Sequence, residues 1–558
     1  MRREVSAVNK KSSSFPILFA LLALLVSTCA VVFPASAQAV PTSTGSITVS
    51  GTVASSYDAY QIFSANVVDG DSDAKIATDL AWANDAARDA VLPVLHSAGM
   101  PKSQTTAQEA AEWLNDDSHL TSALSAQLAR FLQSSGAVSV PLNAGVVAEL
   151  PCGYWLIVAD DDTIAQNEAG TAPIMVLVGG SAVTVKPKAA TPKVQKHVLE
   201  DSIAAWGKAA DATVADDLYW RLSATVPAGL SAYDSYTVQF VDTMSAGLDP
   251  SKVAASMHVY VAAGADGGFD AVKTGKDGRA GTEPAKGWTD ITAQCSIKVA
   301  ADGTFTVRTG DLIAALGGAD AFAVGARVVA VYNAPLNSAC NHGIAKGNPN
   351  EAYLRYPRSP FADQSGDAGF TRTPSDDATA YTWGLSLIKR SSADDKPLAG
   401  AKLRIIDDHG RILTTDGTWS TDADACVTTG ADGHVELRGV DAGVYTVEEV
   451  AAPKGYTAFE GKRAVTVTSE GLDVKQVAAA KPKVTVSAES PLRVDNVDTG
   501  TGSIELSVIN TPSKEASRGF MPSTGDRTLV LVAVLAAIGV AAIIVALVIK
   551  RGGGRHGK

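Results

Sequence analysis

The sequence is poor in the residues that build disulfide scaffolds, metal centres and nucleic-acid interfaces. Its 558 residues include five cysteines, too few for a disulfide-built fold, and eight histidines, none paired with another at metal-ligand spacing. Positive charge is in deficit, because 47 lysines and arginines are outnumbered by 59 aspartates and glutamates, for a net charge of −12. We therefore expect no metal, no cofactor and no nucleic-acid partner. P-loop and nucleophile-elbow motifs are also missing from the sequence, so we expect no enzyme acting on external substrates.

Long hydrophobic runs are confined to the two ends of the chain. Near the start, basic residues precede an apolar run over residues 15–33 and the small-residue stretch ASAQA. This order predicts a secretory signal peptide over residues 1–39. Near the end, residues 528–549 hold no charge and are followed by Lys550 and Arg551, which predicts a transmembrane helix with a basic cytoplasmic tail.

Between these ends, apolar and polar residues alternate in short stretches, the pattern of half-buried β-strands. Residues 40–190 open with TGSITVSGTV and contain two helical patches, which predicts a β domain with a helical insertion. Residues 191–381 and 382–513 hold strand patterns separated by turn signals such as GKDGR, which predicts two β-sandwiches. The predicted fold class is mainly β: three tandem Ig-like sandwich domains, then a linker and a C-terminal transmembrane helix in residues 514–558.

The few cysteines outside the signal peptide are unevenly placed. Cys295 and Cys340 fall within the same predicted sandwich, and for an exported protein we predict a disulfide between them. Cys152 and Cys426 lie in different predicted domains, so we interpret both as single buried thiols.

A short polar motif stands close before the C-terminal apolar run. It reads MPSTG and consists of Met521, Pro522, Ser523, Thr524 and Gly525. Together with the apolar run and the basic tail, it resembles the cell-wall sorting signal that sortases of Gram-positive bacteria recognise, with Met where the Leu-Pro-any-Thr-Gly pattern has Leu. The resemblance implies that a sortase cleaves between Thr524 and Gly525 and transfers the acyl group to an amine. The helix would then be a temporary anchor.

Residues 382–513 resemble the collagen-adhesin B-type domain of surface proteins at three places. LSLIK places Lys389 in the first strand, VYTVEEVAAPKGY places Glu449 at the family's glutamate, and VINTP places Asn510 in the last strand. The resemblance implies an internal isopeptide bond between Lys389 and Asn510, promoted by Glu449. A buried amine readily loses its proton and becomes nucleophilic, while a buried carboxyl group stays protonated and can donate. An ordinary buried ion pair is the alternative.

The predicted middle domain resembles the middle domain of sortase-assembled pilins. PKVQKHV supplies Lys196, and QFVDTMSAGLD supplies Asp242 at the position of a catalytic acid. In GNPNEAYLRYPRSP, Arg358 and Ser359 stand where that family has an asparagine. Lys196 and Asp242 are therefore a conditional pair, since the expected bond lacks its acceptor, and the Cys295–Cys340 disulfide would staple the domain instead.

Three lysines lie where the first two predicted domains meet, in VTVKPKAATPKVQK. This stretch resembles the segment of pilin backbones whose lysine is the acyl acceptor of a pilin-specific sortase, with Lys186 in place of a tyrosine. The resemblance implies Lys188 as the acceptor, with Lys186 and Lys193 as alternates. A lysine that follows a proline at a domain junction is held extended and exposed. The alternative is that these lysines are only solvated side chains of a polar linker.

Taken together, the motifs resemble the major shaft subunit of Gram-positive sortase-assembled pili, or type-2 fimbriae. The resemblance implies a secreted protein that is joined into fibres on the cell wall and supports adhesion. The implied partners are other copies of the chain, pilin-specific and housekeeping sortases, minor pilins, peptidoglycan, and a host receptor or glycan. A monomeric wall-anchored adhesin and a minor pilin at the base or tip are the alternatives.

Overall fold

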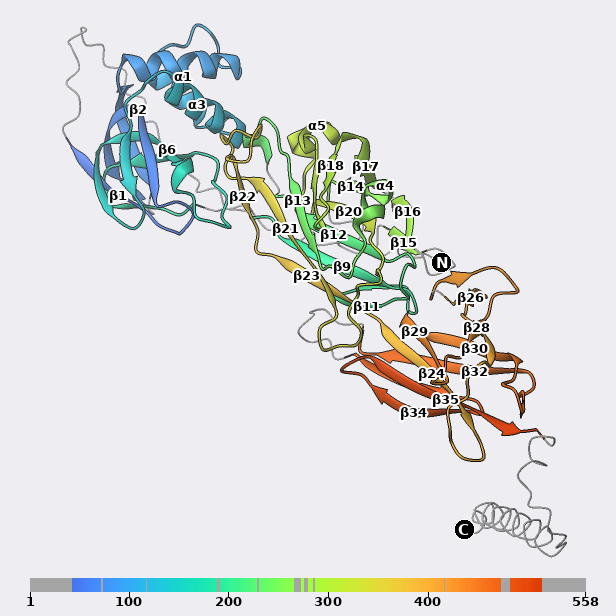
Figure 1. Cartoon of the computed structure of the whole chain (residues 1–558). Coiled ribbons are helices and arrows are strands. Elements are labelled where there is room, and N and C mark those ends of the chain that lie inside the picture. The colour runs from blue at the N-terminus through green and yellow to red at the C-terminus, as the bar shows by residue number, and fades with distance from the viewer. Residues whose placement is uncertain are drawn as a thin grey trace, which may run out of the picture.

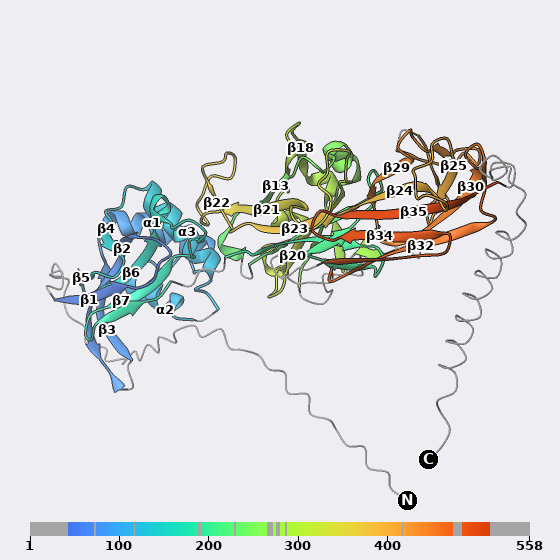
Figure 2. The same ribbon diagram turned by 60° about the horizontal axis from the view of Figure 1, so that its bottom comes forward.

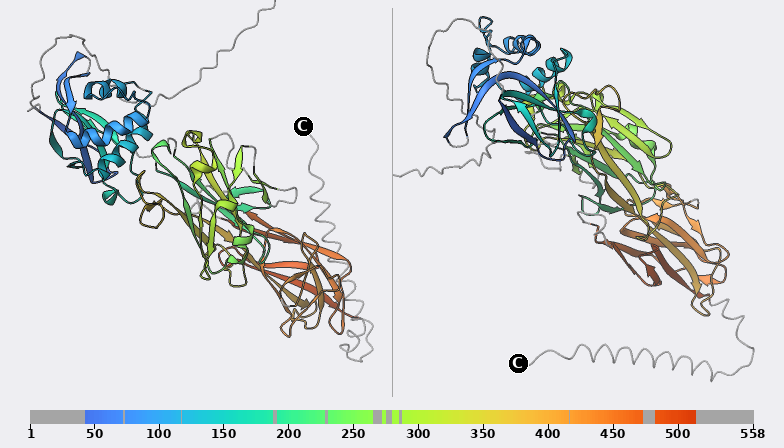
Figure 3. Two further views of the ribbon diagram at one scale, coloured as in Figure 1. Left: turned by 90° about the horizontal axis from the view of Figure 1, so that it is seen from above. Right: turned by 90° about the vertical axis from the view of Figure 1, so that its left-hand side faces the viewer.

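The computed structural model describes residues 43–513, except for short gaps at 72–73, 117, 188–190, 228–229, 265–271, 275–279, 285–286, 416 and 473–481. The described strands form three groups along the chain, and each sheet takes its strands from one group alone. Figure 1 shows the groups following one another in a row, and the views of Figure 3 agree. The prediction of a mainly β chain of tandem sandwiches is confirmed. The predicted signal peptide and transmembrane helix lie outside the described residues.

The first group contains two sheets and a helical layer. One sheet has the order β5-β1-β8, namely Val147–Pro151, Thr44–Val49 and Val183–Val185. The other has the order β3-β2-β6-β7, with β4 also paired to β2: Lys75–Trp82, Ser56–Asp69, Gly153–Ala159, Ile174–Val178 and, for β4, Val140–Asn143.

Helices α1 (Asp85–Ser97), α2 (Ala107–Leu114) and α3 (Ser122–Ser134) form the helical insertion between β3 and β4. The second helix begins with a capping box in which Thr106 and Glu109 satisfy each other's backbone N–H groups. The apolar side chains of these helices share a core with β2 and β6. Among the described residues, no helix is long and apolar enough to span a membrane.

The second group is a sandwich of two larger sheets with a continuous apolar core. The first sheet has the order β10-β9-β12-β20-β14-β17: Ala205–Gly207, Val194–Glu200, Tyr219–Thr225, Arg327–Asn333, His258–Ala262 and Trp288–Asp290. The second has the order β11-β23-β21-β13-β19-β18: Ala209–Asp211, Asp376–Tyr381, Asn348–Pro357, Gln239–Met244, Thr304–Arg308 and Ser296–Val299. Smaller elements border them: β22 (Phe370–Arg372), the hairpin β15 (Val272–Thr274) and β16 (Ala280–Pro284), α4 (Val253–Ser256) and α5 (Leu312–Ala315).

The third group is a second sandwich with its own core. One sheet has the order β29-β24-β35-β31, with β34 also on β35: His434–Val440, Trp383–Ser391, Ser503–Pro512, Tyr456–Thr457 and, for β34, Leu492–Asp498. The other has the order β27-β26-β25-β30-β32-β33, with β28 on β25: Trp419–Ser420, Ile412–Leu413, Lys402–Ile406, Gly443–Ala451, Lys462–Glu470, Lys483–Ala488 and, for β28, Val427–Thr428.

The first and last strands of the third group are parallel neighbours. β24 pairs with β35 in a register that runs from Gly384 opposite Ser503 to Ser391 opposite Asn510. Figure 2 shows the two strands side by side in the same sheet. Because they run the same way, the chain enters this sandwich at one end of the sheet and leaves it at the other.

Candidate functional site

Strand periodicity places the three predicted residues of the third group on inward faces. Along β24, Trp383, Leu385, Leu387 and Lys389 alternate with more exposed neighbours, so the lysine continues an apolar row. Along β35, Ile504, Leu506 and Val508 precede Asn510 in the same way, and on β30 of the facing sheet Tyr445 and Val447 precede Glu449. The relative exposures of Lys389, Glu449 and Asn510 are 0%, 7% and 1%. The same alternation that builds the core therefore brings three polar groups into it.

The three side chains are in mutual contact. Lys389 Nζ lies 2.5 Å from Asn510 Oδ1 and 3.0 Å from Glu449 Oε1, and Asn510 Nδ2 donates to the same Glu449 oxygen over 2.7 Å. The other carboxylate oxygen, Oε2, accepts the backbone N–H of Phe459 over 3.0 Å. Glu449 Oε1 thus lies within hydrogen-bond distance of both the amine and the amide nitrogen.

The surroundings of Lys389 favour its neutral form. Burial lowers the pKa of this lysine, and the attraction of Glu449 only partly opposes the effect. The ring of Phe459, centred 5.2 Å from Nζ, closes the site on an apolar side. A neutral amine is the form that can attack a carbonyl carbon.

The arrangement has the parts needed for amide exchange. The nucleophile would be Lys389 Nζ, the electrophile Asn510 Cγ, and the leaving group the ammonia formed from Nδ2. A carboxyl group that touches both nitrogens can take a proton from the attacking amine and deliver it to the leaving one. The strands hold the reacting groups together before any reaction begins, which removes most of the entropic barrier.

The second group contains a comparable buried constellation. Lys196 on β9 lies on an inward face between Val194 and Val198, and Asp242 on β13 of the facing sheet lies between Phe240 and Met244. Both charged residues are fully buried, and their side chains form an ion pair.

Tyr332 and Asn350 complete this constellation. The Tyr332 hydroxyl lies 2.7 Å from Lys196 Nζ, donates to Asp242 Oδ2 over 2.9 Å, and accepts from Asn350 Nδ2 over 3.0 Å. Burial lowers the pKa of Lys196 to about 8 and raises that of Asp242, each against the attraction of its partner.

The sequence motif offers no carboxamide at Arg358 and Ser359, and the structure places a different carboxamide, that of Asn350, in the hydrogen-bond network of Lys196. Asn350 is fully buried and contacts the same Tyr332 hydroxyl as the lysine, and its Oδ1 has no hydrogen-bond partner within the described part of the chain. The strand pattern contained the signal: Asn348, Asn350, Ala352 and Leu354 alternate along β21, so two asparagines occupy an otherwise apolar inward face. The family motif points instead to the far end of this strand, which Arg358 and Ser359 follow.

Arg358 and Ser359 instead contact the first group. The Ser359 hydroxyl donates to Asp161 Oδ2 over 2.7 Å, and Arg358 Nη1 donates to the Asp161 carbonyl over 3.2 Å. Gly170 N–H donates in turn to the Arg358 carbonyl over 2.7 Å. These residues connect the first two groups and take no part in the buried constellation.

The predicted Cys295–Cys340 disulfide is wrong, because both thiols are free. Cys295 comes directly before β18, whose Ser296 lies opposite Arg308 and, one strand further, Gln239 at the start of β13. Cys340 packs against Gly247, beyond the end of β13. The thiols thus lie at opposite ends of the sheet, whereas a disulfide requires Cα atoms within about 7 Å. Cys152 is buried and Cys426 half-buried, both as free thiols.

The expected sortase-linked residues fall mostly outside the described part of the chain. Lys188 lies in the gap at 188–190, and Met521, Pro522, Ser523, Thr524 and Gly525 follow the last described residue. The alternates Lys186 and Lys193 are described, and both are exposed.

Comparison with known proteins identifies the class of the third group first. Residues 384–481, which include Lys389 and Glu449, match the family model of the SpaA prealbumin-like fold domain. A curated relative, the trypsin-resistant surface T6 protein of Streptococcus pyogenes serotype M6, is 27% identical over 173 residues. That match covers 30% of this chain and spans 30% of the length of the relative.

Two solved structures superimpose over most of the chain. The T6 backbone pilin of Streptococcus pyogenes serotype M6 gives a TM-score of 0.46 at 16% identity, covering 84% of this chain and 98% of that one. The full-length major pilin SpaD of Corynebacterium diphtheriae gives a TM-score of 0.41 at 16% identity, with the same two coverages.

Proposed function

We propose that the chain is the repeating shaft subunit of a covalently polymerised surface pilus whose two sandwiches are each closed by an internal Lys–Asn isopeptide bond. The observation that carries the proposal is the buried contact of Lys389, Glu449 and Asn510 across the first and last strands of the third group. A bond there lets tension pass from the start of β24 to the end of β35 without unfolding the residues between. A subunit under tension along a fibre requires that property.

The bond between Lys389 and Asn510 forms by transamidation. The neutral amine attacks Asn510 Cγ, Glu449 relays a proton to Nδ2, and the C–N bond to that nitrogen breaks, releasing ammonia. In the second group, Lys196 attacks Asn350 in the same manner, with Asp242 as the acid and the Tyr332 hydroxyl as the polar contact between them. Neither step needs an external reactant.

Assembly itself is a separate reaction, performed by sortase. Its cysteine attacks the Thr524 carbonyl and releases the amine of Gly525, and Lys188 of the next subunit then attacks the thioester to form an amide. Pilin-specific sortase repeats this step between copies of the chain, and housekeeping sortase finally transfers the fibre to peptidoglycan. The assembled fibre stands on the cell wall, meets minor pilins at its ends, and supports adhesion to a host receptor or glycan.

The SpaA-type match of residues 384–481 and the surface location named for the T6 relative support this proposal. The acidic composition and the sequence order of export signal, tandem β domains and sorting motif are those of an exported surface protein. The exposed alternates Lys186 and Lys193 provide matched controls for Lys188.

The test of assembly is an immunoblot of cell-wall extracts boiled in detergent and reductant. Wild-type protein should give a high-mass ladder, Lys188→Ala should give the monomer alone, and Lys193→Ala should keep the ladder. A ladder that survives Lys188→Ala would move the acceptor to another lysine. A single monomeric band from the wild type would contradict a shaft subunit and support a wall-anchored adhesin.

A further inference from the structure

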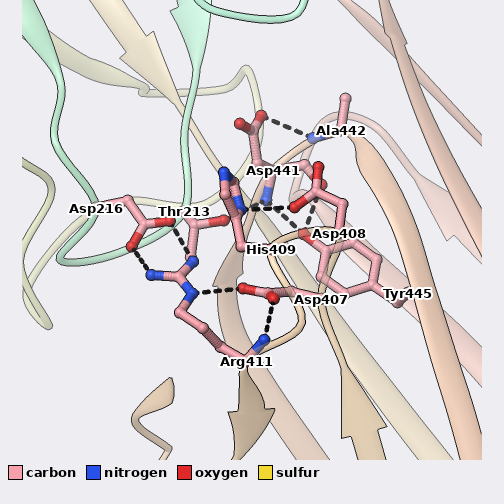
Figure 4. A network of polar contacts seen from close by, with 9 residues as sticks. All are labelled: Thr213, Asp216, Asp407, Asp408, His409, Arg411, Asp441, Ala442 and Tyr445. Atoms are coloured by element: carbon pink, nitrogen blue, oxygen red, sulfur yellow. Dashed lines mark hydrogen bonds and ion pairs between the residues drawn. The ribbon is translucent and has the colours of Figure 1, made fainter. Parts of the chain in front are cut away.

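A cavity of about 220 Å³ lies where the second and third groups meet, and acidic side chains dominate its wall. They come from both groups: Asp201, Asp211, Asp216 and Asp217 from the second, and Asp407, Asp408 and Asp441 from the third. Figure 4 shows the part of this wall that surrounds Arg411 and Tyr445. A concentration of like charges at a junction requires counter-charge if both sides are to stay in contact.

Basic side chains compensate some of these carboxylates. The guanidinium of Arg411 binds both oxygens of Asp216, at 2.5 Å each, and its Nε binds Asp407 over 2.7 Å (Figure 4). At the rim, Lys252 Nζ lies 2.9 Å from Asp217. His409, which also lines the cavity, has its Nδ1 2.7 Å from Asp408. No ion pair between described residues reaches Asp211 or Asp441.

Two of those carboxylates, one from each group, converge on one N–H group. The backbone N–H of Ala442 donates to Asp441 Oδ1 over 2.7 Å and to Asp211 Oδ2 over 3.2 Å. A single neutral donor does not offset two carboxyl groups this close together, so burial and the neighbouring acids raise the pKa of Asp441 well above its ordinary value, and its side chain hydrogen-bonds to that of Asp211. Glu200 lies behind them, where its Oε2 accepts the backbone N–H of Asp211 over 3.0 Å, and burial together with Asp211 raises the pKa of its carboxyl group to about 8.

Asp211 also has an oxygen without a partner. Asp211 is 2% exposed and lines the cavity, yet its Oδ1 accepts no hydrogen bond from an N–H group or a hydroxyl of any described residue. The other oxygen is held firmly, because the indole N–H of Trp383 donates to it over 2.7 Å. A buried carboxylate oxygen is expensive to leave unsatisfied, so a ligand at this position would have a specific partner.

We propose that this junction binds a divalent cation of the calcium type, with Asp211 Oδ1 and the carboxylate of Asp441 as its protein anchors. Calcium ions accept six to eight oxygen ligands in flexible geometry and combine carboxylates with carbonyls and water. A cavity of this size has room for the ion and several waters. Because the anchors belong to different groups, the bound ion would tighten the joint that Arg411 and Asp216 already form.

The binding test uses terbium as a luminescent probe of calcium sites in the purified full-length chain. Trp383 donates to Asp211, and Tyr445 lines the cavity, so aromatic excitation should sensitise a bound terbium ion. We expect sensitised emission that saturates with one ion and is displaced by calcium chloride. Asp211→Asn and Asp441→Asn should each lower the affinity for terbium and for calcium by about tenfold or more. Asp217→Asn is the matched control, because Lys252 already compensates that carboxylate, and it should bind like the wild type.

A second measurement keeps the proposal testable if a variant is unstable. Calcium chloride should raise the melting temperature of the wild type and of Asp217→Asn, but not that of Asp211→Asn. Emission that calcium does not displace, or equal binding by Asp211→Asn, would overturn the proposal. It would also be overturned if mild acid stabilised the calcium-free protein as well as calcium does, because a shared proton would then join the two carboxylates.

Discussion

Asn510 lies two residues further along the shared register than Lys389, yet the two side chains touch. The backbone of Lys389 is opposite Val508, and that of Asn510 is opposite Ser391, while Nζ and Oδ1 are 2.5 Å apart. Because side chains two residues apart on neighbouring strands share a face, the long lysine chain spans the offset along the inward surface. The contact therefore joins the two strands near the end at which the chain leaves the sandwich.

Mass spectrometry of the intact chain should detect both proposed bonds. Each transamidation removes one ammonia, so the wild type should be lighter than its sequence mass by about 34 Da, or about 17 Da for each bond. Lys389→Met and Asn350→Ala should each restore about 17 Da beyond the change due to the substitution itself. A wild-type mass equal to the sequence mass would show that the buried groups are only hydrogen-bonded.

Glu449→Ala should stop bond formation in the third group while leaving Lys389 and Asn510 in place. The substitution removes the carboxyl group that contacts both nitrogens, so Asn510 should keep its amide nitrogen and release no ammonia. Closing a loop of about 120 residues contributes on the order of 4–5 kcal/mol to the free energy of unfolding by loop entropy, so the variant should unfold well below the wild type.

The control for that variant is Glu448→Ala on the same strand. Glu448 is only half-buried and pairs with Arg404 on its own sheet, 3.1 Å away, so this change should leave the bond intact. Equal ammonia loss in Glu449→Ala and wild type would exclude a role for Glu449 in the reaction.

Asn350 can be separated from the neighbouring buried asparagine by comparing two variants. The amide nitrogen of Asn348 donates to the Asn341 and Ala380 carbonyls. The Asn348→Ala variant should therefore be less stable, but Lys196 should still bond to Asn350 and release its ammonia. Asn350→Ala should abolish that loss. Peptide mapping that finds Lys196 joined to Asn348 would show that the acceptor is assigned to the wrong residue.

The pKa of Lys196 leads to a pH dependence in the unbonded protein. In Asn350→Ala the lysine stays free, and its folded pKa of about 8 lies below its ordinary value of 10.5. Between these values the unfolded chain binds more protons than the folded chain, so the free energy of unfolding should rise with pH from about 8 to 10.5. Chemical denaturation across this range measures the effect. The double variant Lys196→Met, Asn350→Ala should lack it, and equal slopes in both would contradict the lowered pKa.

The four described cysteines should all react as free thiols in denaturant, before and after treatment with reductant. Reductant should leave the melting temperature of the native protein unchanged, because no bond joins Cys295 to Cys340. A melting temperature that falls on reduction would contradict the separation of the two thiols across the sheet.

The residues of the third group could be predicted because local pattern decides their place. Period-two alternation alone puts Lys389 behind Leu387, and Asn510 behind Val508, on buried faces. Asn350 follows the same rule on β21, but the family motif points past the end of that strand to Arg358 and Ser359, and a motif carries no information about the face on which a residue lies. The separation of the cysteines depends on strand order in the folded sheet, which alternation does not encode.

The acidic junction is a different case. Asp211 and Asp441 are separated by 230 positions in the sequence, and each reads there as an ordinary turn or strand-end aspartate. Only the docking of the second group against the third brings them to one N–H group. Contacts of this kind are set by tertiary packing, so neither composition nor periodicity predicts them.

Mechanical unfolding provides the most direct test of the proposed role. If the chain is pulled from its two ends, force enters the third group through β24 and leaves through β35, so a bond between Lys389 and Asn510 carries it past the residues between them. Those residues should stay folded in the wild type. In Lys389→Met they should unravel and lengthen the extended chain by about 400 Å, since about 120 residues become extensible.

Asn350→Ala should release a different length, which makes the two sandwiches distinguishable in one experiment. The loop between Lys196 and Asn350 spans about 150 residues, so its release should add about 500 Å. A wild-type chain that extends as far as the two variants combined would mean that force passes through both sandwiches, and the bonded shaft subunit would be excluded. If only the first group of the wild type unfolds and extends, tension bypasses the bonded loops of the second and third groups, as a fibre subunit loaded from end to end requires.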